Sequence, residues 1–247
     1  MQVYRGIPTL TNQHRRRPAE LVGVVPVSEE WTVARHKDAV EDIVDGLDVP
    51  FVLDAGTGMY LNAIVLDVPL APKAPEAVRA EAQRLAKGAD DPRRVAREAE
   101  LRLMGAPERG SIWSGRLRYE ATFVYLRLPR TVLDENIARR TASIVRGGLD
   151  EAGELLAQEA AGRPPNHSVR DAVGVKETVL LASGAISREE AHERIYVRTR
   201  RLARRQMRWF DKLVKSLGDD RFLIAENPSQ AVRVARNSHI MHDIMGV

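Results

Sequence analysis

The amino-acid sequence predicts a helix-rich α/β fold built around a parallel sheet. A short apolar run at residues 50–53 leads through a glycine-containing turn into a helical pattern at residues 60–64. A second apolar run lies within residues 120–128, and a helical pattern at residues 131–146 follows it. The longest periodic segment, residues 187–216, has the apolar spacing of an amphipathic helix. Strands that alternate with helices are typical of a parallel sheet covered by helices.

The composition is that of a cysteine-free, mildly basic globular protein. The chain has 247 residues, 44% of them apolar, so it can bury a substantial core in one main domain. Its formal net charge of +4 permits nucleic acid or polyphosphate partners without requiring them. The lack of cysteine excludes disulfides and thiolate metal sites. The N-terminus has no signal-peptide pattern, and no run reaches the roughly 18 apolar residues of a membrane span, so we expect a cytoplasmic protein without a membrane partner.

The first fifty residues predict a loop, a strand and a helix. Residues 1–17 are polar and contain proline, which is typical of a loop. Residues 21–25 form a short valine-rich run and predict a buried strand. Either Ser28 or Thr32 can cap a helix over residues 33–46.

The next segment predicts a strand, a turn and three helices. The apolar run at residues 50–53 predicts a buried strand, and a helix is expected at residues 60–64. Residues 69–75 are a linker. Two charged helices are expected over residues 76–87 and 92–103, the second with a proline in its first turn.

The middle of the chain predicts a strand followed by two helices. The strand lies within residues 120–128, and the first helix covers residues 131–146. Gly147 and Gly148 are suited to stop that helix in a left-handed conformation. Residues 149–160 are helical again.

The last third is dominated by one long helix. Ser187 and Glu190 form a capping box at its start, and the helix reaches about residue 216. A last short strand is expected at residues 221–224, and a final helix from Pro228 onward.

The turn Gly56-Thr57-Gly58 is a candidate phosphate site. Glycines let the backbone approach a phosphate closely, while the threonine hydroxyl and the N–H groups of the turn can donate hydrogen bonds to it. An ordinary strand-to-helix turn is the alternative interpretation of the same three residues.

The long helix carries a basic surface. Few acidic residues stand at helical offsets to neutralise this charge, so the pattern favours a polyanion such as RNA, with a solvated surface as the alternative. Its basic residues are Arg194, Arg198, Arg201, Arg204, Arg205, Arg208 and Lys212.

Arg139 and Arg140 lie shortly after a predicted strand. An arginine near the carboxyl edge of a sheet can clamp a diphosphate with two hydrogen bonds. The alternative is a surface ion pair with Asp134 or Glu135.

Two other kinds of site are not supported. The chain does not contain Gly-x-x-x-x-Gly-Lys-Ser/Thr, the loop that holds nucleotide phosphates, and the nearest string, residues 173–178, has the wrong spacing. His239 and His242 stand three apart, but further zinc ligands are lacking near them, so no metal site is predicted.

Six segments, in order, carry the motifs of one known family. The segments are residues 1–6 (Met-Gln-Val-Tyr-Arg-Gly), 50–61, 91–100, 137–140, 172–177 (Ala-Val-Gly-Val-Lys-Glu) and 199–210. The last of them, Thr-Arg-Arg-Leu-Ala-Arg-Arg-Gln-Met-Arg-Trp-Phe, carries the most specific motif. On these segments, which are spread over nearly the whole chain, the sequence resembles the tRNA dimethylallyltransferases.

The resemblance implies a P-loop NTPase-like parallel sheet flanked by helices, here lacking the first strand and the phosphate loop. It implies transfer of a dimethylallyl group from its diphosphate to N6 of an adenine next to the tRNA anticodon, with Mg²⁺. Gln2 would help to hold the flipped adenine. Gly56, Thr57, Gly58 and Arg140 would face the diphosphate.

The resemblance also implies an RNA surface. The residues it assigns to RNA binding are Arg94, Arg97, Arg201, Arg204, Arg205, Gln206 and Arg208. The family's helical insertion is shortened here to about residues 72–104, within a single transferase-like core over residues 1–247.

The chain departs from the family pattern at its start. The family's general base, an aspartate, would precede Met1 by two positions, so no catalytic residue is assigned within this chain. Residues 7–12 replace the family's Gly-Thr-Ala-Lys-Pro stretch. Three interpretations stay open: a transferase whose N-terminal portion is missing from this sequence, a catalytically inactive paralogue that binds RNA through its arginine-rich helix, and a structural remnant. A sheet without its first strand is expected to expose an unpaired edge.

Overall fold

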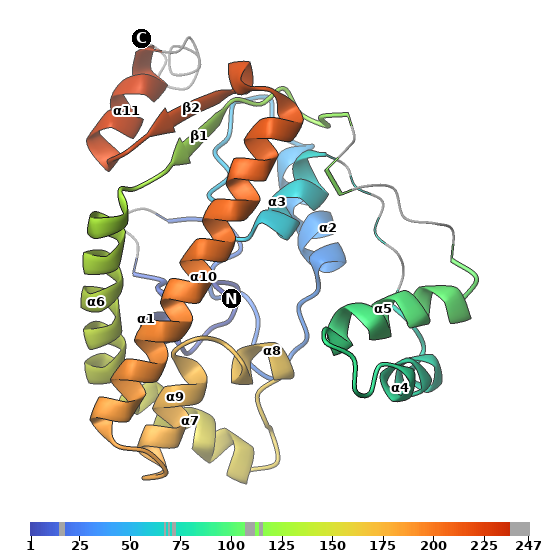
Figure 1. Cartoon of the computed structure of the whole chain (residues 1–247), viewed down its shortest axis with the longest axis vertical. Coiled ribbons are helices and arrows are strands. Elements are labelled where there is room, and N and C mark those ends of the chain that lie inside the picture. The colour runs from blue at the N-terminus through green and yellow to red at the C-terminus, as the bar shows by residue number, and fades with distance from the viewer. Residues whose placement is uncertain are drawn as a thin grey trace. The chain divides into compact units, whose positions relative to one another are not determined.

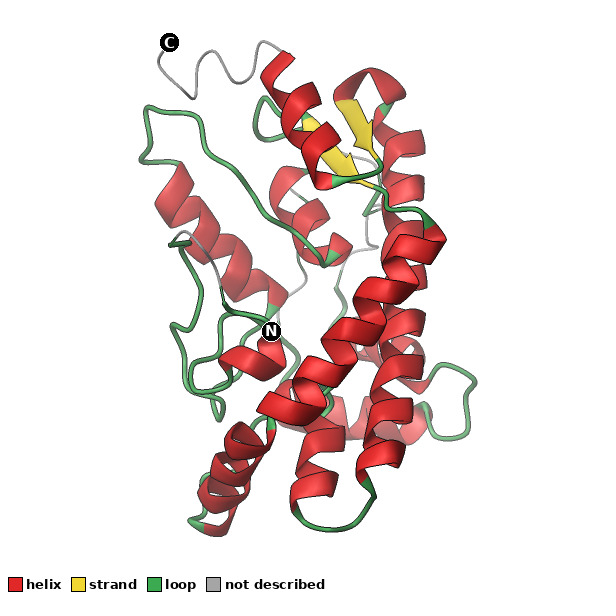
Figure 2. Cartoon of the chain, turned by 90° about the vertical axis from the view of Figure 1, so that its left-hand side faces the viewer, coloured by secondary structure: helices red, strands yellow, loops and turns green. Residues whose placement is uncertain are grey.

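The structure is a computed structural model in which the chain divides into two compact units (Figures 1 and 2). The first unit comprises Met1–Gly58 and Ala121–Val247, and the second comprises Met59–Glu120. The predicted helical insertion at about residues 72–104 falls within the second unit. The structure describes residues 1–14, 18–66, 68, 70, 73–106, 112–113 and 116–237, except the side chains of Arg93, Arg236 and Asn237.

The N-terminal segment is part of the core, so the prediction of a loop over residues 1–17 was wrong in part. It contains a short helix, α1 (Pro8–Thr11), and buries Val3, Tyr4, Ile7 and Leu10. Val3, Ile7 and Leu10 stand three or four positions apart, which fits one face of a helix, but only Pro8–Thr11 is helical and most of the segment is irregular backbone. The prediction of a loop rested on the polar and proline-containing composition, which does not reveal that these apolar residues are buried.

The strand predicted at residues 21–25 is reduced to a single bridge. Tyr4 and Val25 form an isolated parallel bridge, in which Arg5 N–H donates to the Val25 carbonyl at 2.9 Å. The valines of this run are apolar enough for a strand, but a ladder also needs an extended neighbour. The neighbour here turns into α1 after a few residues.

Helix α2 (Val33–Val44) is confirmed, and Thr32 is its N-cap, accepting a hydrogen bond from the Arg35 N–H at 3.2 Å. The strand predicted at residues 50–53 is not formed within the described residues, and Val52 in its middle is 80% exposed. Propensity for a strand is expressed only where a partner strand completes the ladder. The helix after it is confirmed as α3 (Gly58–Val65).

The second unit is built mainly from α4 (Glu76–Leu85) and α5 (Pro92–Leu103), which pack against each other, and both predicted helices are confirmed. Ala82 and Ala99 are buried, and their small side chains let neighbouring backbones approach closely. Asp91 caps the N-terminus of α5 with its side chain, and Pro92 occupies the first helical turn as predicted.

The described sheet has two parallel strands, β1 (Phe123–Leu126) and β2 (Phe222–Ala225), both at predicted positions. The register pairs Phe123 with Phe222, whose rings stack at 4.6 Å between centroids. A short 3₁₀ turn, Asp219–Arg221, precedes β2, and α11 (Pro228–Asn237) follows it and packs against the strands.

The remaining helices of the first unit surround the core. They are α6 (Arg130–Gly147), α7 (Leu149–Ala160), α8 (His167–Arg170), α9 (Val175–Ala182) and α10 (Arg188–Leu217). Ser187 caps α10 as predicted, since its Oγ accepts from the Glu190 N–H at 3.1 Å. Helices α6 and α10 lie side by side and run in opposite directions (Figures 1 and 2). The two short helices α8 and α9 were not predicted from the pattern.

The glycine pair between α6 and α7 does not act as predicted. Gly148 has φ −96° and ψ 0°, which is not left-handed, and α7 begins at the next residue. A Cβ on Gly148 would lie 2.6 Å from Leu10 Cδ2 and 2.7 Å from the Ile144 carbonyl oxygen. Glycine is therefore needed at this position for close approach rather than for a left-handed cap.

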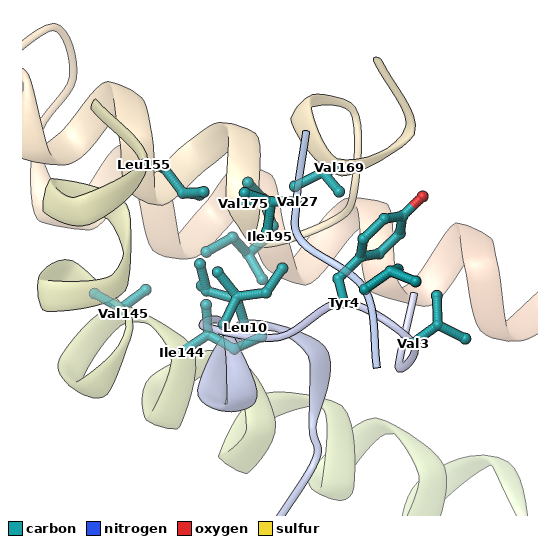
Figure 3. Packing of buried hydrophobic residues seen from close by; sticks show 12 residues of the cluster. Val3, Tyr4, Leu10, Val27, Ile144, Val145, Leu155, Val169, Val175 and Ile195 are labelled. Atoms are coloured by element: carbon teal, nitrogen blue, oxygen red, sulfur yellow. The ribbon is translucent and has the colours of Figure 1, made fainter. Parts of the chain in front are cut away.

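The core of the first unit joins the N-terminal segment to α6, α7, α9 and α10 (Figure 3). Burial of apolar side chains from residues 3–27 together with those from residues 144–195 explains why segments distant in the chain form one unit. The members are Val3, Tyr4, Ile7, Leu10, Val25, Val27, Ile144, Val145, Leu155, Val169, Val175 and Ile195.

Candidate functional site

The predicted phosphate turn lies directly against α10. The carbonyl of Gly56 accepts a hydrogen bond of 2.5 Å from the side-chain amide of Gln206. Gly58 is buried against the indole of Trp209, and a Cβ at Gly58 would lie only 2.0 Å from Trp209 Cδ1. Thr57, between the two glycines, is exposed. Trp209 follows Gln206 by three residues, so the helical spacing places both side chains on one side of α10.

The turn can present hydrogen-bond donors to an anion. Gly58 is the first residue of α3, so Thr57 stands immediately before the N-terminus of this helix. The first N–H groups of a helix have no partner within the helix, and the helix dipole favours negative charge there. The exposed hydroxyl of Thr57 adds a further donor at the same place. These features suit a phosphate or diphosphate group.

Four arginines of α10 form an exposed stripe, called here the arginine stripe: Arg201, Arg204, Arg205 and Arg208. At 3.6 residues per turn they fall within an arc of about 100° on one side of the helix. Within the described part of the chain, none of these four side chains has a carboxylate partner. Their charge is therefore available to a polyanion, as the sequence predicted.

Three other arginines of α10 are neutralised by ion pairs, so the prediction that Arg194 and Arg198 belong to the free basic surface was wrong. Two of the three carboxylate partners come from α6 and α9, and no helical offset within α10 could reveal them. The pairs are Arg194 with Glu190 at 2.5 Å, Arg198 with the buried Glu177, and Arg200 with Asp134 at 3.0 Å.

A second polar cluster joins β1 to α10. Asp211 accepts hydrogen bonds from the Tyr125 hydroxyl at 3.2 Å and from Arg127 Nε at 3.0 Å. Burial, with the negative charge of Asp211 as the next cause, raises the pKa of Tyr125 to about 12. The phenol thus stays protonated and ties the strand to the helix that carries the arginine stripe. Sequence reasoning missed this cluster because its members are far apart in the chain.

Arg140 contacts the N-terminal segment. Its Nη2 donates to the Thr9 carbonyl at 2.5 Å, and Glu151 accepts from the Thr9 N–H at 2.7 Å and the Leu10 N–H at 2.9 Å. Burial lowers the pKa of Arg140, while the nearby Glu151 opposes this shift. The alternative ion pair with Asp134 is wrong, because Asp134 pairs with Arg200 instead.

The structure does not bring Arg140 close to Thr57. Arg200 pairs with Asp134 across α6 and α10, and the two helices run in opposite directions. Gln206, which holds the turn, lies six residues beyond Arg200 in α10. Arg140 lies six residues beyond Asp134 in α6, so the two residues are displaced from the ion pair in opposite directions. At 1.5 Å per residue, the two positions are about 18 Å apart along the helices. A shared diphosphate role for Thr57 and Arg140 therefore stays a prediction that the described contacts do not support.

Gln2 lies on a well-fixed piece of backbone. Its carbonyl accepts hydrogen bonds from the Gly23 N–H at 2.9 Å and from Gln13 Nε2 at 2.8 Å, and the same Gln13 amide also donates to the Tyr4 carbonyl at 2.6 Å. The side chain of Gln2 is half-buried. Its predicted contact with adenine stays a prediction.

The RNA-binding residues predicted in the second unit are engaged within their own helix. On α5, Arg94 pairs with Glu98 at 2.9 Å and Arg97 pairs with Glu100 at 2.6 Å. The pair of Arg94 with Glu98 is exposed and contributes little to stability, so a phosphate could displace it at small cost, whereas the pair of Arg97 with Glu100 is partly buried. Their role in RNA binding is untested.

Among the described residues no cluster of three or more His, Asp and Glu side chains could hold a metal ion. Mg²⁺ at phosphate sites is commonly held by one or two side chains together with the phosphates themselves, so the Thr57 hydroxyl would suit such an ion only alongside a diphosphate. His239 and His242 lie outside the described residues. Within the described residues, the structure contains no helix with the length and apolar character of a membrane span.

Comparison with known proteins identifies relatives over the whole chain. The profile of the IPP transferase family matches residues 2–100 and 88–213. A tRNA dimethylallyltransferase of Rubrobacter xylanophilus is 56% identical over 249 aligned residues, which cover 100% of this chain and 85% of the relative. A tRNA dimethylallyltransferase of Thermobifida fusca is 31% identical over 85% of this chain and 75% of its own length.

Solved structures share the fold. The full-length tRNA isopentenylpyrophosphate transferase of Bacillus halodurans superposes with a TM-score of 0.66 at 22% identity, covering 96% of this chain and 84% of that one. A eukaryotic dimethylallyltransferase acting on tRNA gives a TM-score of 0.71 at 23% identity, covering 100% of this chain and 71% of that one. The predicted P-loop NTPase-like, helix-rich α/β fold is thus confirmed.

Proposed function

Because the chain belongs to the IPP transferase family, we propose that it transfers a dimethylallyl group from dimethylallyl diphosphate to N6 of an adenine next to the tRNA anticodon. The observation that carries the proposal is 56% identity, over the full length of this chain, to a relative named tRNA dimethylallyltransferase. In this reaction the adenine N6–C1 bond forms and the C1–O bond breaks. The diphosphate leaves with the electron pair, and the N6 proton passes to a base.

The donor side of the reaction is assigned to the turn before α3. A departing diphosphate gains negative charge in the transition state, so fixed donors aimed at it lower the barrier. Thr57 and the first N–H groups of α3 can supply such donors, and Mg²⁺, when bound, would neutralise part of the same charge. The described residues account for binding and for leaving-group stabilisation.

The acceptor side is assigned to the arginine stripe and Gln2. Unpaired arginines bind phosphates of the RNA backbone and release counterions, which makes the affinity depend steeply on salt. The target adenine must leave its stack before N6 can be attacked, and Gln2 is proposed to hold the flipped base by its edge.

The test uses the 247-residue chain with an anticodon stem-loop, dimethylallyl diphosphate and Mg²⁺. We expect the adenosine to gain the mass of one dimethylallyl group in the digested RNA. The matched control is a stem-loop with guanosine at the target position, which has no N6 amine. Absence of any transfer with the adenosine stem-loop would contradict the proposal.

The arginine stripe supports a second candidate, an inactive paralogue that binds RNA. The stripe can bind RNA without any catalytic group. Stem-loop binding without transfer would favour this candidate. Loss of binding in the Arg204→Ala plus Arg205→Ala variant would assign that binding to the stripe.

A further inference from the structure

We infer that Gln206 is a positioning residue that holds the Gly56–Thr57–Gly58 turn on α10, rather than a residue that contacts RNA. This inference rests on the proposed function, because it gives the turn its role toward the diphosphate. Its basis is the hydrogen bond of 2.5 Å from Gln206 Nε2 to the Gly56 carbonyl. This bond uses one of the two N–H groups of the amide and directs the amide toward the turn.

The position of Gln206 on α10 supports this assignment. At 3.6 residues per turn, Gln206 points between about 100° and 160° away from each arginine of the arginine stripe. A polyanion that lies along the stripe therefore meets a different side of the helix. Family resemblance alone had grouped Gln206 with the arginines, since it is adjacent to them in the motif.

Trp209 provides a second point of attachment. It follows Gln206 by three residues, so the two side chains are neighbours on the helix surface. Its indole packs so closely on Gly58 that no Cβ fits between them. The amide fixes one end of the turn and the indole fixes the other, with Thr57 exposed between them.

The turn depends on this attachment because residues 51–55 before it form no strand ladder within the described chain. Helix α10 thus carries the arginine stripe on one side and fixes the donor turn on another. Misplacement of a reacting group by 1 Å can cost about 100-fold in rate. Loss of the Gln206 bond should therefore impair the donor site while the RNA surface stays intact.

The experiment compares Gln206→Leu with Arg205→Ala in the full chain. Hydrogen–deuterium exchange of the peptide over residues 54–60 should become faster in Gln206→Leu and stay unchanged in Arg205→Ala. Pyrophosphate, used as the probe, should bind about tenfold more weakly to Gln206→Leu, the effect of one lost hydrogen bond. The stem-loop Kd should change less than about twofold in Gln206→Leu and rise several-fold in Arg205→Ala.

Unchanged exchange at residues 54–60 in Gln206→Leu would overturn the inference, and so would a stem-loop Kd that rises as much as in Arg205→Ala. The exchange measurement needs neither substrate nor activity. It therefore still tests the positioning role if the wild-type chain binds neither pyrophosphate nor stem-loop, which would count against the proposed function instead. If Gln206→Leu does not fold, Gln206→Asn provides the same comparison, because its shorter side chain cannot reach the Gly56 carbonyl.

Discussion

Gly58→Ala adds a single methyl group at the point where the turn meets α10. The new Cβ would lie 2.0 Å from Cδ1, 2.1 Å from Nε1 and 2.4 Å from Cγ of Trp209. Carbon atoms in contact prefer a separation of at least about 3.5 Å. Either the indole or the turn must therefore move by roughly 1.5 Å to relieve the overlap.

The expected cost follows from two opposing effects. Overpacking of a buried contact costs about 1–3 kcal/mol. Alanine has a higher helix propensity than glycine, but this returns at most about 1 kcal/mol, and less at the first residue of a helix such as Gly58. The net loss of unfolding free energy should be about 1–2 kcal/mol. In a chain of this size each 1 kcal/mol lowers Tm by about 2–4 °C.

Thermal unfolding followed by circular dichroism measures the effect, and Gly153→Ala is the matched control. Gly153 lies inside α7, and an added Cβ there meets nothing within 4 Å. The same substitution at this position should raise the unfolding free energy by about 0.5–1 kcal/mol, because it only removes the entropic cost of glycine in a helix. The two variants should thus shift Tm in opposite directions.

A double-mutant cycle with Trp209→Leu tests the physical reason. Removal of the indole makes room for the Cβ, so Gly58→Ala should cost about 1 kcal/mol less in the Trp209→Leu background than in the wild type. An equal cost in both backgrounds would refute the claim that the indole is what requires glycine at position 58. A stabilising effect of Gly58→Ala alone would refute the contact itself.

Three further predictions concern the arginine stripe, the pair of Glu177 with Arg198, and the partly buried phenol of Tyr125. In the Arg204→Ala plus Arg205→Ala variant, the logarithm of the stem-loop binding constant should depend less steeply on the logarithm of the salt concentration, with a slope smaller in magnitude by about 2 and an unchanged Tm. An unchanged slope would exclude phosphate contact by these two arginines. Glu177→Gln should lower the free energy of unfolding, measured in urea, by about 3 kcal/mol. This is the lower end of the range for breaking a buried ion pair, because the side chain of Arg198 keeps 32% exposure. A cost below about 1 kcal/mol would contradict this prediction. The folded-state pKa of Tyr125 is raised from 10.0 to about 12, so its stabilising contribution is complete below pH 10 and lost as the pH rises toward 12. The phenolate absorbance that distinguishes wild type from Tyr125→Phe should accordingly titrate near pH 12, and a midpoint near 10 would contradict this.

The helices were predictable because their signals are local. Helix α5 begins at Pro92 and ends at Leu103, as predicted, since its N-cap, its proline and its apolar spacing all lie within or next to its 12 residues. The strand predicted at residues 50–53 shows the limit of such signals. Its composition is suitable, but a strand exists only with a partner, and partners are brought by tertiary structure.

For the candidate site, the sequence by itself determined the residue types and the side of α10 on which the arginine stripe lies, because helical periodicity fixes which residues share a face. The family motifs further pointed to the turn at residues 56–58. Only the tertiary structure decided which charges remain available. Asp134 and Glu177, which lie on other helices, neutralise Arg200 and Arg198 from 66 and 21 residues away in the chain, and Arg140 is engaged by Thr9. Such contacts depend on how helices pack together, and no spacing within one helix encodes them.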